Sequence, residues 1–413
     1  MRILKNSLLN VIGYLIPGLL SIPILGYMSR ALGVEEFGYL SIILAVVGYA
    51  SIFDVGITRS VIREVALYKN NNSEVKKILS TSTIVVALLG ILASTIIILL
   101  GSQIASYLKV SAYILNEFIY SIYIATVSIP IFLITQVFSS LLEGKQEFAR
   151  LNIYRAFSGT IIVLVPAIAL LFQKSLLAAV FGLLISRIIS MLLIFYYSKG
   201  YSLNFYFDRG VFKRLLNFGG WIAVSNIISP IMSYFDRFIL SNHLGGNVVG
   251  YYTAPSEAIS RLGILPSAIA KTIFPMMSAN NSHENILVKK QAYLLVLFAI
   301  VPIASILLFF AKDIITLWLG KDFSVNSIEI FQILIFGLVF NAFAQVPFTS
   351  IQARGLSKIT AYIHLFEFIP YLILLLTLIY FYGLIGAAWA WTIRMFIDLL
   401  VLLIYDTISL REK

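Results

Sequence analysis

Charged side chains interrupt long apolar stretches of this chain, and two pairs of them have a spacing that could carry chemistry. Glu257 and Arg261 lie four residues apart, as do Arg394 and Asp398, so each pair occupies one face of a helix. Each pair could neutralise itself, or it could face an aqueous cavity. A further carboxylate, Glu367, stands alone in an aromatic run, where a partner on another helix or a protonatable coupling site would account for it.

A second group of charges follows an apolar stretch in the segment FDVGITRSVIRE. Here Asp54 precedes Arg59 and Arg63, and the two arginines share a helical face. Arginine binds a diphosphate through paired hydrogen bonds, so these residues could contact an anionic headgroup, or they could simply anchor the helix at the membrane surface. The carboxylates that we consider for ion coupling are Asp54, Glu257, Glu367 and Asp398.

Other kinds of chemistry lack the residues that they need. The chain has no cysteine and only three histidines, which are scattered at positions 243, 283 and 364. Disulfides and thiolate sites are therefore excluded, and we expect no metal centre. The sequence contains no dinucleotide-binding glycine motif, no phosphate-binding loop and no Gly-x-Ser-x-Gly motif, so we expect no cofactor and no enzymatic activity.

The elements that carry these charges are predicted to be transmembrane helices. Of 413 residues, 60% are hydrophobic and 12% are charged, whereas soluble domains have roughly 25% charged residues. Twelve apolar segments are each long enough to cross a bilayer as a helix. They lie near 7–29, 37–58, 79–101, 114–141, 153–173, 176–198, 216–239, 250–276, 291–311, 327–351, 360–382 and 384–407. We therefore predict an all-α integral membrane protein with twelve transmembrane helices.

The basic residues indicate the orientation of these helices. Lys and Arg are about four times as frequent in the loops on the side of the N-terminus as in the loops on the other side. Because basic loops stay in the cytoplasm, we expect both termini there. The net charge of +11 is thus explained by topology, and we predict no binding of nucleic acid.

The two halves of the chain resemble each other. The segment from Leu8 to Arg30 matches the segment from Leu215 to Arg237 without a gap, and the shared residues include Asn, Gly, Pro and Arg. Arg187 and Arg394 have the same separation of 207 positions. Six spans in each half predict two parallel six-helix lobes, residues 1–200 and 216–413, joined by a cytoplasmic linker over 201–215.

The duplicated segments also suggest a gate. Pro23 and Pro230 occupy equivalent positions in them, and Pro255 lies in the next predicted helix. Proline removes a backbone donor and bends a helix, so we assign these residues to gating. Arg30 and Arg237 end the two segments near the outer surface, where they could extend to the headgroups or act together at the outer mouth.

Four motifs then suggest a family. They are SRALGVEEFGYLS from Ser29, FDVGITR from Phe53, DRFIL from Asp236 and GYYTAP from Gly250. In this order they resemble Wzx-type O-antigen and polysaccharide flippases of the multidrug/oligosaccharidyl-lipid/polysaccharide exporter superfamily, and the resemblance covers the whole chain. It implies the MATE-like exporter fold.

The resemblance also implies a function. It predicts that the protein moves an oligosaccharide repeat unit of O-antigen or capsule, linked to undecaprenyl diphosphate, from the cytoplasmic to the outer leaflet of the bacterial inner membrane. The expected mechanism is alternating access coupled to an ion gradient, with a polysaccharide polymerase and a chain-length regulator as partners. The positions that we expect to contact phosphate or anionic sugar are Arg30, Arg59, Arg63, Arg237 and Arg261.

Two alternatives were weighed against this prediction. The first is a cation-coupled small-molecule or multidrug exporter of the same fold. Such exporters commonly place a carboxylate in the first helix, but residues 7–29 contain no acidic residue. The second is a membrane enzyme such as a polymerase or glycosyltransferase, which would need a sizeable loop outside the membrane. The longest outer loop, near residues 311–326, is too short for a catalytic domain.

Overall fold

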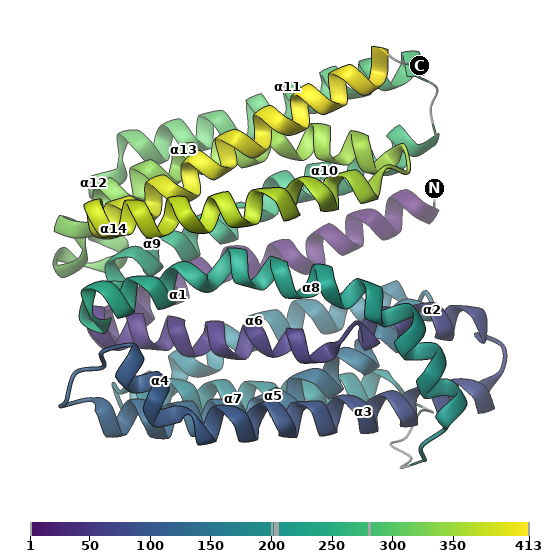
Figure 1. Ribbon diagram of the computed structural model, residues 1–413, viewed down its shortest axis with the longest axis horizontal. Coiled ribbons are helices and arrows are strands. Elements are labelled where there is room, and N and C mark those ends of the chain that lie inside the picture. Colours follow the sequence, from purple (N-terminus) through teal and green to yellow (C-terminus); the bar gives the residue numbers. More distant parts are fainter. Residues whose placement is uncertain (1, 200, 202–205, 280–281, 412–413) are drawn as a thin grey trace. The chain divides into compact units, whose positions relative to one another are not determined.

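The described part of the protein is helical throughout. The computed structural model describes residues 2–199, 201, 206–279 and 282–411, and every regular element in these ranges is an α-helix or a short 3-10 helix (Figure 1). The chain divides into two compact units. The first unit comprises residues 12–247, and the second comprises residues 248–413 together with 1–11.

The first unit is built from long helices joined by short connections. Its elements are α1 (Arg2–Tyr49), which begins before the unit, η1 (Ala50–Asp54), α2 (Ile57–Leu67), α3 (Asn72–Leu99), α4 (Gly101–Tyr107), α5 (Leu115–Gly144), α6 (Phe148–Phe172), α7 (Leu176–Tyr197), α8 (Arg209–Leu244) and η2 (Gly246–Val248), at the boundary. Within this unit α5 packs against both α3 and α7, and α7 also packs against α6.

The second unit is organised around α13. Its elements are α9 (Val249–Leu262), α10 (Ile264–Ala279), α11 (Ser282–Phe309), α12 (Ala311–Leu319), α13 (Lys321–Ala353) and α14 (Ser357–Arg411). Helix α13 contacts every other helix of this unit. At one end Asp406 of α14 binds Lys289 Nζ and Arg354 Nη2, each at 2.5 Å, so that one buried carboxylate joins α11, α13 and α14.

Eight stretches in the described residues are long and apolar enough to cross a membrane. Lys358–Ile408 contains two of the predicted spans, and Pro17–Asp54 overlaps two others, 7–29 and 37–58. The predicted spans 216–239 and 250–276 fall on α8 and on α9 with α10, which are not among the eight. The prediction of an all-α integral membrane protein is confirmed, whereas the number of twelve spans stays a prediction.

The duplicated sequence produces the same backbone turn in both copies. Each copy contains the motif Leu-Gly-x4-Gly-Tyr, which begins at Leu32 and again at Leu244. Its first glycine is Gly33 in one copy, with φ 75°, and Gly245 in the other, with φ 90°. A side chain at these angles would clash with the backbone, so glycine allows the long helix to end and the chain to turn.

Two of the prolines that we assigned to gating lie within helices, so their role in gating stays a prediction. Pro23 and Pro255 lie inside α1 and α9, and each helix continues past its proline. The predicted span 250–276 is instead divided at Gly263, just before Pro266. Because Pro266 has no N–H to donate to the carbonyl of Leu262, it accounts for this division. The side chain of Pro230 lies outside the described residues.

The linker between the predicted lobes is attached to α3. The Oγ of Ser80 donates a 2.6 Å hydrogen bond to the carbonyl of Tyr206, and the N–H of Asp208 donates to Thr81 Oγ1 at 3.0 Å. Asp208 in turn caps α8, since its Oδ1 accepts the N–H of Val211 at 2.9 Å. This hydrogen bond lowers the pKa of Asp208 below its ordinary value.

One arginine then fastens the start of α8 to two other helices. Arg214 Nε lies 2.9 Å from Glu64 of α2, and its Nη2 lies 2.6 Å from Glu74 of α3. The side chain of Glu64 is only 3% exposed, so it depends on this partner for its charge.

We expect Arg214→Gln to lower the free energy of unfolding by about 2 kcal/mol, because it leaves the buried Glu64 carboxylate under-neutralised. The apparent melting temperature of the purified protein in detergent would measure this loss. Arg63→Gln is the matched control, because Arg63 also pairs with Glu64, at 3.2 Å, but its side chain is 49% exposed. Equal melting temperatures for the two variants would contradict the role given to Arg214.

Candidate functional site

Four polar residues of the second unit lie together between the two arms of α14. This helix is interrupted at Gly383, which has a φ of 58°, and the chain continues as a second arm. His364 and Glu367 lie on the first arm, three residues apart and therefore on one face. Arg394 and Asp398 lie on the second arm. The break at Gly383 allows the second arm to pack back against the first.

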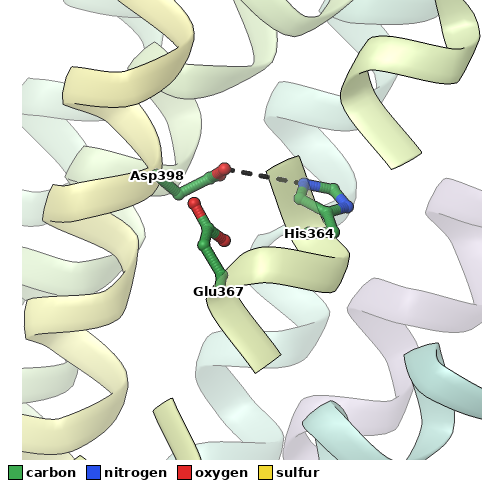
Figure 2. Close-up of side chains that lie close together, drawn as sticks. All are labelled: His364, Glu367 and Asp398. Carbon is green, nitrogen blue, oxygen red and sulfur yellow. Dashed lines mark ion pairs between the residues drawn. The ribbon is translucent and has the colours of Figure 1, made fainter. Parts of the chain in front are cut away.

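His364, Glu367 and Asp398 form what we call the carboxylate cluster. His364 Nε2 lies 3.5 Å from Asp398 Oδ1, and one nitrogen or oxygen atom from each of the three residues lies within 4.8 Å of the others. Figure 2 shows Asp398 and His364 facing each other across their ion pair, with the carboxyl group of Glu367 pointing toward Asp398. The cluster thus joins residues that are more than 30 positions apart in the sequence.

The carboxylates of this cluster have buried oxygens without hydrogen-bond partners in the described ranges. Both oxygens of Glu367 are buried and have no hydrogen-bond partner within the described ranges, and the Asp398 side chain is only 10% exposed. Two carboxylates in an apolar surrounding repel each other when both are charged. A proton or a small cation between them would relieve that repulsion, so the arrangement is suited to hold one exchangeable positive charge.

Of the two charged pairs predicted from their spacing, one forms an ion pair and the other does not in the described part of the chain. Arg261 Nη2 contacts Glu257 Oε2 at 3.3 Å, so this pair forms as its spacing allows. In the part of the chain that the structure describes, Asp398 forms its ion pair with His364, and Arg394 instead lies over the ring of Tyr371 at 5.0 Å. The local spacing of Arg394 and Asp398 therefore did not determine their partners.

A groove of about 500 Å³ adjoins the cluster. Glu367 and Arg394 are the charged residues in its lining, and the rest of the lining is aliphatic or aromatic. The lining residues are Ile359, Tyr362, Ile363, Phe366, Glu367, Pro370, Tyr371 and Leu374 from the first arm and Arg394, Ile397 and Val401 from the second.

In the first unit, the acidic candidate has local partners. Asp54 ends η1, and its Oδ1 accepts hydrogen bonds from Thr58 Oγ1 at 2.6 Å and from the Thr58 N–H at 3.1 Å. The Asp54 carboxylate therefore accepts a backbone N–H from the first turn of α2, which has no partner within the helix. Arg59 and Arg63 follow on α2 with exposed side chains, and Arg63 pairs with Glu64.

The two arginines at the ends of the duplicated segments differ in exposure. Arg30 is exposed, whereas Arg237 is only 2% exposed and is the largest of the fully buried side chains. Arg237 Nη1 donates to the carbonyl of Ser41 at 3.4 Å, and the guanidinium lies 5.2 Å from the centre of the Tyr234 ring. Equivalent positions in the sequence repeat therefore have different environments.

Three residues gained importance only from the structure. His364 was not connected with Glu367, although their spacing of three residues on a helix was a usable signal. Asp406 binds two basic residues but lies near the end of an apolar stretch, where no local pattern indicates its partners. Arg187 was noted only as the repeat counterpart of Arg394.

The helical architecture and the buried charges define a multi-pass membrane protein with the exporter fold. A lipid II flippase, MurJ, in an inward closed conformation has a TM-score of 0.79 and 18% identity, with 98% of this chain and 89% of that chain covered. A multidrug resistance MATE family transporter in an inward-facing conformation also has a TM-score of 0.79, with 16% identity and 98% of both chains covered. These likenesses confirm the predicted fold.

The sequence comparisons are more specific. The family described as "Polysaccharide biosynthesis protein" matches residues 3–281. A "Putative O-antigen transporter" of Shigella flexneri is 42% identical over 405 residues, which cover 97% of each chain. A "Capsular polysaccharide biosynthesis protein CapF" of Staphylococcus aureus is 27% identical over 55% of this chain and 60% of its own. The chain belongs to the polysaccharide biosynthesis protein family.

We expect two acidic residues of the second unit to respond differently to neutralisation. Asp406→Asn should lower the free energy of unfolding by about 3 kcal/mol, because Lys289 and Arg354 lose their common partner. Glu367→Gln should leave stability unchanged or raise it, because it removes a carboxylate that has no hydrogen bond to lose. Thermal unfolding in detergent measures both.

A melting temperature for Glu367→Gln as low as that for Asp406→Asn would mean that the cluster supports the fold rather than binding an ion. Glu329→Gln, at an exposed position on α13, is the control for removing a carboxylate as such.

Proposed function

We propose that this protein is a flippase that moves a lipid-linked oligosaccharide of the O-antigen or capsular type from the cytoplasmic to the outer leaflet of a bacterial inner membrane. The observation that carries the proposal is the 42% identity to the Shigella flexneri protein named as an O-antigen transporter, over 97% of both chains. The carrier lipid is undecaprenyl diphosphate. A polysaccharide polymerase and a chain-length regulator would act on the unit after it has crossed.

The physical task of such a protein is to solvate the headgroup. A sugar diphosphate forms many hydrogen bonds with water and carries charge, so it cannot enter hydrocarbon without replacement partners. The prenyl tail needs no such help, because it is as apolar as the lipid around it. The protein therefore has to offer polar and cationic groups along a path for the headgroup only.

The architecture that fits this task has twelve transmembrane helices in two parallel six-helix lobes. The lobes comprise residues 1–200 and 216–413, with a cytoplasmic linker over 201–215 and both termini in the cytoplasm. Alternating access between the lobes would expose the headgroup path first to the inside and then to the outside. Pro23, Pro230 and Pro255 remain our candidates for bending during this change.

The carboxylate cluster is our candidate for coupling transport to a proton or sodium gradient. Glu367 and Asp398 support this assignment better than the other two acidic candidates, because their buried carboxylates lack full neutralisation. Asp54 is hydrogen-bonded to Thr58, and Glu257 pairs with Arg261. An exchangeable cation would therefore change the electrostatic energy most at the cluster.

Arginines are our candidates for contacts with the diphosphate or with anionic sugars. Arg30, Arg59 and Arg63 have exposed side chains, and Arg261 is 38% exposed, so each of these can reach a ligand. Arg237 would reach one only if its buried surroundings open.

Loss of coupling gives a direct test. In vesicles that contain the purified protein and a defined undecaprenyl-diphosphate-linked oligosaccharide, we expect an imposed proton or sodium gradient to accelerate movement between leaflets. Glu367→Gln and Asp398→Asn should abolish that acceleration. Undiminished transport after collapse of all ion gradients would contradict coupling, whereas absence of any transport by the unmodified protein would contradict the flippase itself.

The cationic path has a separate test. Arg59→Ala and Arg261→Ala should lower export of surface polysaccharide in a strain that depends on this protein, while the amount of protein in the membrane stays constant. Full export by both variants would remove the support for these contacts. Drug sensitivity measured in the same strain tests the alternative of a small-molecule exporter, which predicts hypersensitivity on deletion.

A further inference from the structure

Arg187 holds a charge deep within a membrane-spanning helix. It is the twelfth residue of α7 (Leu176–Tyr197), and this whole helix is apolar and long enough to cross the membrane. A charged side chain at the centre of a bilayer is costly unless it has a partner, and it is therefore expected to serve a function.

Within the described residues, Arg187 has no carboxylate partner and no hydrogen bond. Its guanidinium lies over the ring of Phe132 of α5, with the guanidinium carbon 4.6 Å from the ring centre. Its Nε is buried without a hydrogen-bond partner. The residue as a whole is half-buried.

The surroundings of Arg187 are polar on the side of α6. Tyr154 of α6, which is only 5% exposed, lies near Arg187 and adjoins the hydroxyls of Ser139 and Ser158. Ser158 also donates to Ser190 of α7 at 2.9 Å. These hydroxyls make the surroundings polar, but none of them supplies the negative charge that a guanidinium needs.

Arg394, the repeat counterpart of Arg187, has acidic neighbours that Arg187 lacks in the described part of the chain. Arg394 lies 207 positions later and also stacks on an aromatic ring, that of Tyr371, at 5.0 Å. Two carboxylates, Glu367 and Asp398, lie on the helix faces next to Arg394. The second unit thus supplies acidic residues near its intramembrane arginine, whereas Arg187 in the first unit has none within ion-pair distance in the described ranges.

We propose that Arg187 binds the diphosphate of the prenyl-linked substrate while the headgroup passes the middle of the membrane. This inference rests on the proposed function and adds a binding residue on α7 to it. A guanidinium presents paired donors that match two phosphate oxygens, and stacking on Phe132 holds its plane in place. A diphosphate attached to a prenyl chain is an anion that can reach this depth, because its tail stays in lipid.

Binding to the purified full-length protein in detergent tests the inference. The probes are fluorescently labelled farnesyl diphosphate and labelled farnesol, which differ only in the charged group. We expect Arg187→Gln to weaken binding of the diphosphate about tenfold or more and to leave binding of farnesol unchanged. Arg187→Lys, which keeps the charge but loses the paired donors, should give an intermediate loss. Arg150→Gln, at an exposed residue of α6, is the matched control.

Diphosphate binding by Arg187→Gln that equals that of the unmodified protein would overturn the inference and leave the flippase proposal intact. The melting temperature of Arg187→Gln shows whether that variant folds. If it does not, Arg187→Lys is the test instead, and an affinity of Arg187→Lys for the diphosphate equal to that of the unmodified protein overturns the paired contact. An unmodified protein that binds farnesol as tightly as the diphosphate would instead contradict the proposed function.

Competitors identify the source of the anion. Inorganic diphosphate should displace the labelled diphosphate from the unmodified protein, whereas an excess of phosphatidylglycerol should not. Equal displacement by phosphatidylglycerol would overturn the assignment to a diphosphate and would indicate an ordinary membrane lipid.

Discussion

The free energy of placing charge in hydrocarbon constrains this protein more than any other interaction. The bilayer core offers no water to backbone or side-chain polar groups, so the spans must be helical and nearly every intramembrane charge needs a partner. The described part of the chain follows this rule in several ways. Glu257 pairs with its helical neighbour Arg261, Arg237 is enclosed by backbone and ring contacts, and Asp406 is shared by two basic side chains.

The exceptions to this rule are the places to which we assign function. Within the part of the chain that the structure describes, Glu367 has two buried oxygens without hydrogen bonds, and Arg187 has a stacked ring but no acidic partner. Among the described residues, Glu367 has no cationic side chain within ion-pair distance, and Arg187 has no acidic one. A transporter that exchanges a cation while it carries an anionic headgroup would supply both during its cycle. Glu367 could therefore bind the coupling cation, and Arg187 could bind the anionic headgroup, which are the two ligands that the proposed function requires.

The symmetry of the sequence is retained in backbone geometry but not in charge. Gly33 and Gly245 adopt similar positive φ values, so the duplicated motif makes the same turn in each half. In contrast, Arg187 and Arg394 have different electrostatic surroundings, and Arg30 is exposed where Arg237 is buried. A repeated sequence in which one copy carries carboxylates near its arginine can bind different ligands in its two halves.

The sequence by itself determined the features that depend on local patterns. Apolar length and the scarcity of charge established an all-α membrane protein, and the spacing of Glu257 and Arg261 correctly placed them in contact, because residues four apart on a helix are neighbours. Only the tertiary structure brought His364 and Asp398 together across the break at Gly383, joined Asp406 to Lys289 and left Arg187 without an acidic partner among the described residues. These contacts depend on which helix faces pack together, and helical periodicity in a uniformly apolar chain carries little information about that choice.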